Sequence, residues 1–328
     1  MTGVHNHVNF PEELAIRPLL PRDAHPTHDF GDKQQLAFGA EAQREGIETY
    51  GIAGRVWEAA YLVNSYIDHP STWEFDPPLI DQHLSGHKRV FLELGSGTGI
   101  VAAKIAQAAA LSGRDLVIAT DLPEVCPLLE KNLFVMPKGD SANTQVTLVR
   151  PLSWGNYDHA INIVRELKLV DDPSGHEHGC ITHIICSDLV YFPELLAPLL
   201  RTLLHLTSPP SISIFESQPR VIISYKIRSL SKETPFWLAF GLWFSFEPVI
   251  VRKTDANNLL SEWQRFGSDI EGDGDLAFIF VARRRPESLN WTIPSEDIDL
   301  LGGVGARGTC DKKSDETFET LLLMGLGV

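Results

Sequence analysis

The sequence predicts an α/β fold with a mostly parallel sheet covered by helices on both faces. Three observations lead to this class. Short, continuous apolar runs such as 89–94 and 116–119 are typical of strands buried on both sides. Stretches with apolar residues at helical spacing lie between such runs, and this alternation is the pattern of a parallel sheet. A glycine-rich turn at 95–99 joins the first strand to the helix that follows it.

The individual elements follow from the same patterns. Apolar residues recur at helical spacing from Val56 to Ile67, and proline-rich loops follow them. We expect strands at 89–94, 116–119, 146–149, 181–186, 212–216, 248–252 and 276–282, and helices at 56–67, 100–111, 128–135 and 195–206. The aromatic-rich run 236–246 is expected as a helix or a loop. Residues 155–180 are expected to form a longer helix-plus-loop connection with a turn at 171–175.

Composition along the chain predicts three parts. Residues 1–45 are polar, contain scattered prolines and show no sustained periodicity, so we expect an extended or partly ordered N-terminal arm. Residues 46–286 carry the alternating strands and helices of one domain. Residues 287–328 follow a basic triplet and contain many acids, so we expect a loosely packed C-terminal extension.

The charge balance and the cysteines limit the classes of function. A formal net charge of −15 argues against nucleic-acid binding, because phosphate neutralisation needs Lys and Arg. The four cysteines form no C-x-x-C pair, so neither a disulfide framework nor a zinc site is indicated. The first residues lack the pattern of a signal peptide, and 236–251 is too short and too interrupted to span a bilayer. We expect a soluble monomer in the cytoplasm, and also in the nucleus, without a membrane partner.

The glycine turn carries the clearest chemical signal. Glycines at Gly95, Gly97 and Gly99 allow positive φ and let a ligand approach the backbone. A dinucleotide fingerprint requires a small residue where this chain has Ile100. Glu93 precedes the turn and would repel a pyrophosphate, whereas it suits the ammonium group of S-adenosylmethionine.

The next strand ends in a second acid that fits the same ligand. Asp121 closes the strand at a position where a carboxylate can accept both ribose hydroxyls. Two alternatives stay open: nucleotide binding without methyl transfer, and a purely structural turn followed by a surface aspartate.

A D-x-x-Y sequence stands at the end of the fourth strand. In open α/β sheets, ligands lie beyond the carboxyl ends of the strands, so Asp188 and Tyr191 are expected to face the crevice of the glycine turn. The alternative is that Asp188 caps the next helix while Tyr191 packs against it. Neither histidine pair, at 5–7 or at 176–178, has the further ligands that a metal site needs.

Several motifs together resemble one family. They are Val56-Trp57-Glu58-Ala59-Ala60, Glu93-Leu94-Gly95-Ser96-Gly97-Thr98-Gly99, Leu152-Ser153-Trp154-Gly155, Asp188-Leu189-Val190-Tyr191, Ser224-Tyr225-Lys226 and the run 278–286. This set is similar to the seven-β-strand protein lysine methyltransferases of the methyltransferase-like 21 group, also called methyltransferase family 16. The likeness extends over about residues 45–286. It departs from the family in the 155–180 insertion and in the tail beyond 286, which leaves the choice of substrate open.

The resemblance implies a fold, a cofactor and roles for residues. The fold is the Rossmann-like seven-stranded class I methyltransferase fold, and the cofactor is S-adenosylmethionine. Trp57 matches a tryptophan lining the cofactor site, and Trp154 matches one near the adenine, although either ring can also be a core filler. The three glycines match the loop beside the methionine end, and Asp121 matches the ribose-binding acid. Asp188 and Tyr191 match the motif at the substrate entry.

Three functions are compatible with these residues. The resemblance favours methylation of a lysine in a non-histone protein, such as an elongation factor, a chaperone or an ATPase. The alternatives are a small-molecule N- or O-methyltransferase, for which the aromatic run 236–246 would form a lid, and a non-catalytic partner protein that binds the donor.

Overall fold

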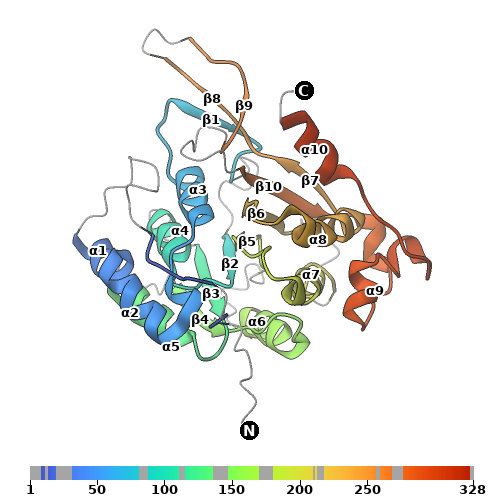
Figure 1. Cartoon of the computed structure of the whole chain (residues 1–328), viewed down its shortest axis with the longest axis horizontal. Coiled ribbons are helices and arrows are strands. Elements are labelled where there is room, and N and C mark those ends of the chain that lie inside the picture. Colours follow the sequence, from blue (N-terminus) through green and yellow to red (C-terminus); the bar gives the residue numbers. More distant parts are fainter. Residues whose placement is uncertain are drawn as a thin grey trace.

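The computed structural model describes residues 9–11, 14–19, 32–80, 88–110, 115–135, 147–169, 180–209, 211–212, 218–255, 259–267 and 276–325. Its centre is a twisted sheet of seven strands, flanked by helices on either side (Figure 1). A smaller three-stranded sheet stands apart from it.

The main sheet has the order β4-β3-β2-β5-β6-β10-β7. Its strands are β2 (Val90–Leu94), β3 (Leu116–Asp121), β4 (Thr147–Pro151), β5 (His183–Ser187), β6 (Arg220–Lys226), β7 (Phe244–Pro248) and β10 (Ala277–Arg284). Neighbouring strands from β4 to β6 pair in parallel, whereas β10 runs antiparallel to both β6 and β7. The sheet confirms the predicted Rossmann-like seven-stranded fold.

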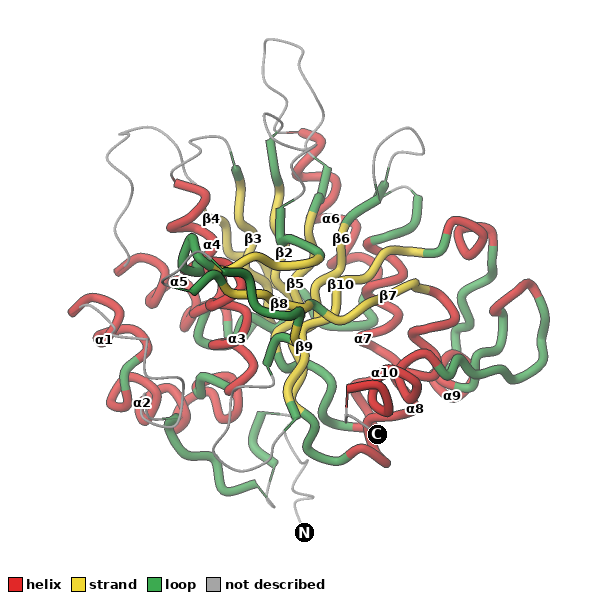
Figure 2. Tube along the Cα trace, turned by 90° about the horizontal axis from the view of Figure 1, so that it is seen from above, coloured by secondary structure: helices red, strands yellow, loops and turns green. Residues whose placement is uncertain are grey.

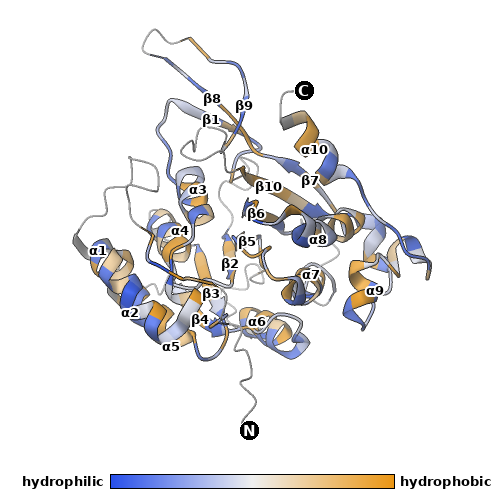
Figure 3. Cartoon of the chain, viewed as in Figure 1, coloured by the Kyte–Doolittle hydropathy of each residue, from blue (hydrophilic) through white to orange (hydrophobic). Residues whose placement is uncertain are grey.

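Helices cover both faces of this sheet, as Figure 2 shows from above. One face carries α1 (Asp32–Phe38), α2 (Ala40–Tyr50), α3 (Glu58–Ile67), α4 (Ile100–Ala110) and α5 (Cys126–Val135). The other carries α6 (Tyr157–Leu169), α7 (Pro193–Leu206), α8 (Leu230–Trp243), α9 (Asp297–Leu301) and α10 (Thr317–Gly325). Along the central strands, side chains alternate between two apolar cores: Phe91 belongs to the core shared with α3 and α4, and Leu92 to the core shared with α6 and α7. The central strands are therefore mostly apolar, whereas the edge strand β7 alternates buried apolar residues with the exposed Ser245 and Glu247 (Figure 3).

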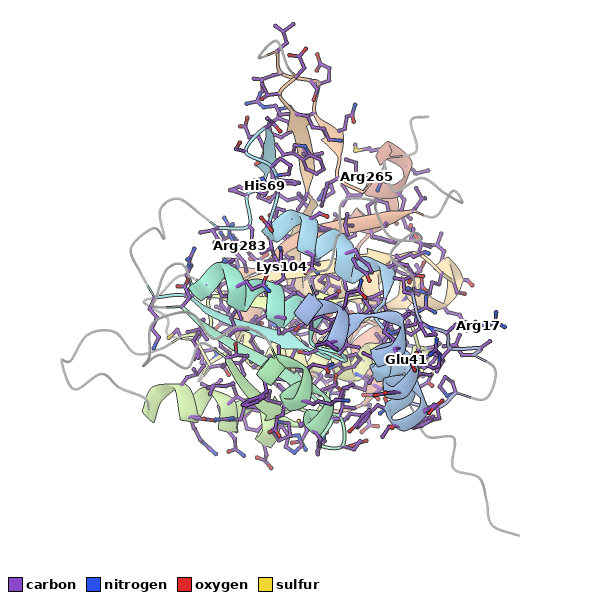
Figure 4. The ribbon with its side chains drawn as sticks, turned by 90° about the vertical axis from the view of Figure 1, so that its left-hand side faces the viewer. Arg17, Glu41, His69, Lys104, Arg265 and Arg283 are labelled. Carbon is purple, nitrogen blue, oxygen red and sulfur yellow. The ribbon has the colours of Figure 1, made fainter. Side chains whose placement is uncertain are left out.

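The small sheet consists of β1 (Trp73–Asp76), β8 (Ile250–Lys253) and β9 (Gln264–Arg265), all antiparallel. It projects from the body of the molecule, with His69 and Arg265 near its base (Figure 4). An aromatic cluster holds it: Phe75 packs edge-on against Phe266 at 4.8 Å between ring centroids and against Tyr66 at 5.1 Å. The sequence predicted a loop where β1 lies, and a single strand at 248–252 where β7 ends and β8 begins.

One further expectation, for the N-terminal arm, differs from the structure, and another, for the fifth strand, falls mostly outside the described residues. Residues 32–50 are helical rather than an aperiodic arm, because α1 and α2 pack on the body through Phe38 and Gln43. Most of the strand expected at 212–216 lies outside the described residues. The strand that pairs with β5 is β6, at Arg220–Lys226.

The prediction of a loosely packed C-terminal extension is wrong for 286–325. This segment forms η3 (Pro286–Asn290), α9, η4 (Ala306–Gly308) and α10. Leu300 and Phe318 are fully buried, and the Phe318 ring stacks on Trp237 at 4.7 Å. The reason is that the second half of α8, from Phe236 to Trp243, consists of apolar residues and needs a cover on its outer side. A few apolar anchors are enough to dock a mostly polar segment. The boundaries at residues 45 and 286 stay predictions.

The aromatic run 236–246 is not a lid. Phe236, Trp237, Phe240 and Trp243 are fully buried in the core between the main sheet and the C-terminal extension. Within the described part of the chain, no helix combines the length and the apolar character needed to cross a membrane.

Candidate active site

The glycine turn lies between the end of β2 and the start of α4. Gly95, Gly97 and Gly99 have φ values of 56°, 53° and 83°, which side chains rarely tolerate. A Cβ on Gly95 would also lie 2.9 Å from the Trp154 ring and 2.9 Å from the Leu189 side chain. The turn is therefore both left-handed and closely covered, which restricts these positions to glycine.

A short segment before α3 covers the other side of the turn. This segment is η1 (Gly51–Gly54), and a Cβ on Gly97 would lie 3.1 Å from the Ala53 carbonyl oxygen. The N-terminal residues hold η1 in place, because the Ile52 N–H donates to the Asn9 carbonyl at 2.8 Å. Residues far apart in the sequence thus enclose the glycine turn.

Glu93 is a buried acid one residue before the end of β2. Its Oε2 accepts a hydrogen bond from the Ala102 N–H in the first turn of α4, at 3.0 Å. Burial raises the pKa of Glu93 to about 8, although hydrogen bonds from Ser96 and Ala102 counteract part of the rise. The charged form is therefore unfavourable without a nearby cation, and a positive ligand would stabilise it.

Asp121 ties the same turn to the end of β3. Its Oδ2 accepts from the Gly97 N–H and its Oδ1 from the Leu122 N–H, both at 2.7 Å. Burial raises its pKa to about 6 against the effect of these two bonds. The structure thus brings both predicted donor-site acids to the glycine turn.

The two tryptophans occupy different places. Trp154 covers Gly95 and meets the Tyr191 ring edge-on, with 6.5 Å between centroids. Trp57 donates its Nε1–H to the Ile52 carbonyl at 3.0 Å. Both rings are partly buried, and Trp154 also packs against the apolar core on the α6 and α7 side of the sheet.

Asp188 follows β5 in a left-handed conformation, with a φ of 62°. The Arg228 guanidinium donates to both of its carboxylate oxygens, each at 2.5 Å. The alternative role as a helix cap does not apply, because α7 begins at Pro193 and its N-cap residue is Phe192. A non-glycine residue in this conformation costs free energy, and the bidentate ion pair helps to maintain it.

Tyr191 lies beside Trp154 and Phe192, whose ring is 4.7 Å away. Burial raises the pKa of Tyr191, and the charges of Asp121 and Asp188 raise it further. The phenol is therefore protonated at neutral pH and keeps an O–H that can be donated.

Sequence reasoning missed the charged side chains around Asp188. The Glu58 carboxylate forms ion pairs with three cations. Its oxygens lie 3.2 Å from an Arg228 nitrogen, 2.9 Å from an Arg55 nitrogen and 3.8 Å from the Lys226 nitrogen. Burial would raise the pKa of Glu58, but a backbone hydrogen bond and these three cations lower it overall.

Two of these cations lie over the Trp57 ring. The Arg55 guanidinium is 4.4 Å and that of Arg228 5.2 Å from its centroid. Glu58 and Lys226 stand inside the sequence motifs already noted, but nothing local in the sequence shows that they meet.

No metal centre is evident in this region. Among the residues that the structure describes, no group of three or more His, Cys, Asp or Glu side chains is placed to hold a metal ion. The histidine pairs at 5–7 and 176–178 lie outside the described residues.

The sheet order, the glycine turn and the acids at the carboxyl edge define a protein of the class I methyltransferase type. The sequence profile of the lysine methyltransferase family matches residues 40–239, which is more than half of the chain. This chain therefore belongs to the lysine methyltransferase family.

A curated relative gives a similar answer. The chain is similar to the protein N-lysine methyltransferase METTL21A of Xenopus tropicalis, with 28% identity over 170 residues. The match covers 52% of this chain and 62% of the relative, so the chain spans less than two thirds of the length of that protein.

Solved structures show weaker likeness. The structure called PigF with SAH has a TM-score of 0.38 at 14% identity, covering 80% of this chain and 67% of that one. The LepI complex with SAM has a TM-score of 0.37 at 11% identity, covering 67% of this chain and 50% of that one. Likenesses at these scores decide neither the fold nor the ligand.

Proposed function

We propose that this chain is an S-adenosylmethionine-dependent methyltransferase that methylates a lysine side chain of a non-histone protein. The observation that carries the proposal is the family match over 40–239, because that range contains every residue assigned to the site from the sequence. An elongation factor, a chaperone or an ATPase is the type of substrate proposed.

The donor site suits a cationic ligand. Two buried acids, Glu93 and Asp121, flank a turn that only glycine can form, and burial raises the pKa of both. A positive charge nearby would favour their ionised forms, whereas a pyrophosphate would oppose them. Trp57, Gly95, Gly97, Gly99 and Trp154 would complete the binding site, with Asp121 accepting hydrogen bonds from the ribose hydroxyls. When bound, S-adenosylmethionine supplies an electrophilic methyl group.

The acceptor side must present a neutral amine. A lysine ammonium has a pKa of about 10.4, so it releases a proton to water before its neutral nitrogen attacks. In the proposed mechanism Asp188 orients the incoming lysine nitrogen, and Tyr191 offers a ring face or its hydroxyl to the same group. Holding the nitrogen in line with the methyl group would supply most of the rate.

The protein partner is proposed from charge. The net charge of −15 would attract a basic, lysine-bearing surface. We also propose that the enzyme acts as a monomer in the cytoplasm, and also in the nucleus, without membrane or nucleic-acid partners. Gel filtration with light scattering and fluorescence imaging of the tagged chain test these two points.

Labelling of a cell extract tests the main proposal. Extract is incubated with S-adenosylmethionine carrying a radioactive methyl group, with and without the purified enzyme. We expect an enzyme-dependent protein band, and mass spectrometry of that band should locate the methyl group on lysine. Label appearing only in small molecules would favour the small-molecule alternative. Donor binding without any labelled product would favour the non-catalytic partner.

A further inference from the structure

Arg228 follows β6 and stands between two acids from other parts of the chain. It donates to both oxygens of Asp188 at 2.5 Å, and its Nη2 lies 3.2 Å from Glu58. Its guanidinium also lies 5.2 Å from the centroid of Trp57. A single cation therefore connects the D-x-x-Y aspartate to the start of α3.

The accessible group of this cluster is the arginine rather than the aspartate. The Asp188 side chain is 1% exposed, whereas that of Arg228 is 28% exposed. Both carboxylate oxygens already accept from the guanidinium. An incoming lysine ammonium thus meets a cation first, and it can reach Asp188 only if that cation moves.

The structure offers Arg228 a second position. Glu58 is 26% exposed and already lies within ion-pair distance of the guanidinium. The Trp57 face beside it stabilises a cation without a hydrogen bond. Moving from Asp188 to Glu58 would keep Arg228 paired while the incoming ammonium pairs with Asp188, so neither charge is left alone in a partly buried site.

We propose that Arg228 is a positioning residue that occupies the place of the substrate's lysine ammonium on Asp188 and is displaced by it onto Glu58 and Trp57. This inference rests on the proposed lysine methylation and adds a basis for its specificity. Only an acceptor that brings its own positive charge replaces what Asp188 loses, so a neutral alcohol or a small aromatic substrate leaves the pair closed.

The exchange has a kinetic consequence. If the competent state is the minor one in the free enzyme, the apparent affinity for the substrate is reduced by that fraction. Removing Arg228 removes this reduction. The KM for the lysine substrate should then fall, while kcat changes less than KM does.

The first experiment uses the protein substrate that the labelling identifies. We expect Arg228→Gln to lower its KM at least about threefold. Arg228→Lys, which keeps the charge but loses the bidentate pair, should lower KM by less and serves if the glutamine variant does not fold. Arg252→Gln is the matched control, because Arg252 likewise pairs with a glutamate, Glu74, and lies over a tryptophan, Trp263, but does so in the small sheet, outside the Asp188 cluster. We expect its KM to stay near the wild-type value.

A raised KM in both Arg228 variants would overturn the proposal. So would a fall in kcat with no change in KM. Either result would make Arg228 a fixed support that holds Asp188 for catalysis, with no exchange.

A second experiment needs no turnover. n-Butylamine, which is a cation at pH 7, serves as a lysine side-chain probe, and its binding is followed by NMR. We expect tighter binding to Arg228→Gln than to the wild type, and loss of the gain in the Arg228→Gln/Asp188→Asn double variant. Equal binding to Arg228→Gln and the wild type would contradict the exchange. Failure of the proposed function itself would appear separately, as the absence of any labelled protein.

Discussion

The acids on the two sides of the candidate site are held in opposite ways. Beside the glycine turn, Glu93 and Asp121 accept hydrogen bonds from backbone N–H groups, and burial raises the pKa of each. Beside β5 and β6, Asp188 and Glu58 are paired with arginine side chains. The proposed donor side therefore gains from a cationic ligand, whereas the proposed acceptor side already carries its own cations. Buried acids without a cationic partner thus favour binding of a cation on the donor side. Acids that already have arginine partners favour replacement of one cation by another on the acceptor side.

The largest predicted effect is a loss of turnover from a change on the acceptor side, without a loss of binding on the donor side. Asp188→Asn keeps the shape of the side chain but removes the charge that orients the lysine nitrogen. We expect kcat to fall about a hundredfold, because small losses of alignment have effects of this size. Binding of S-adenosylhomocysteine, measured by calorimetry, should stay within about twofold of wild type because no donor-site acid changes. Full turnover in this variant would remove Asp188 from the mechanism.

A smaller effect is expected on the donor side. Gly95→Ala places a methyl group 2.9 Å from Trp154 and strains a backbone with a φ of 56°. We expect affinity for S-adenosylhomocysteine to fall about tenfold, a loss of about 1.4 kcal/mol, since the added methyl group pushes the turn and Trp154 away from the positions in which they would meet the donor. Gly308→Ala is the matched control: its φ is 68°, but nothing lies within 4 Å of the added methyl group. If the two variants bind alike, the turn does not contact the donor.

The smallest effect concerns the pH dependence of stability. The pKa of Glu93 is raised from 4.5 to about 8, so over this range the folded protein holds a proton that the unfolded chain has released. Stability therefore falls as the pH rises. Burial, together with nearby arginines, lowers the pKa of His183 from 6.5 to about 3, which makes stability rise with pH below 6.5. Between pH 6.5 and 8 the contribution of His183 is therefore complete, and the comparison with a Glu93 variant separates the contribution of Glu93 from those that both proteins share.

Urea unfolding across that range measures the effect. Between pH 6.5 and 8, we expect the free energy of unfolding of the ligand-free wild type to fall by about 1 kcal/mol more than that of Glu93→Gln, whose side chain does not titrate. Parallel curves for the two proteins would show that Glu93 is ionised throughout, and the contrast between the two halves of the site would then weaken. Saturating S-adenosylmethionine should flatten the wild-type curve, because a bound cation favours the carboxylate.

The sheet was predictable because its signals are local. A parallel strand buried on both faces needs an apolar run, and a left-handed turn after it needs glycine, so 89–99 indicated strand, turn and helix start together. Asp121 and Asp188 could be placed at the same edge because each follows a strand of a parallel sheet. Periodicity failed where burial is decided by a distant neighbour, as in α10, whose Phe318 packs on Trp237.

The sequence by itself determined the class of fold, the glycine turn and the acids at the strand ends, because backbone conformation and burial select those residue types position by position. The tertiary structure alone decided which charges meet. Arg228 is 40 residues from Asp188 and 170 from Glu58 in the chain. An ion pair depends on distances of a few ångströms, and these arise only when the order of the strands brings β5, β6 and the start of α3 together.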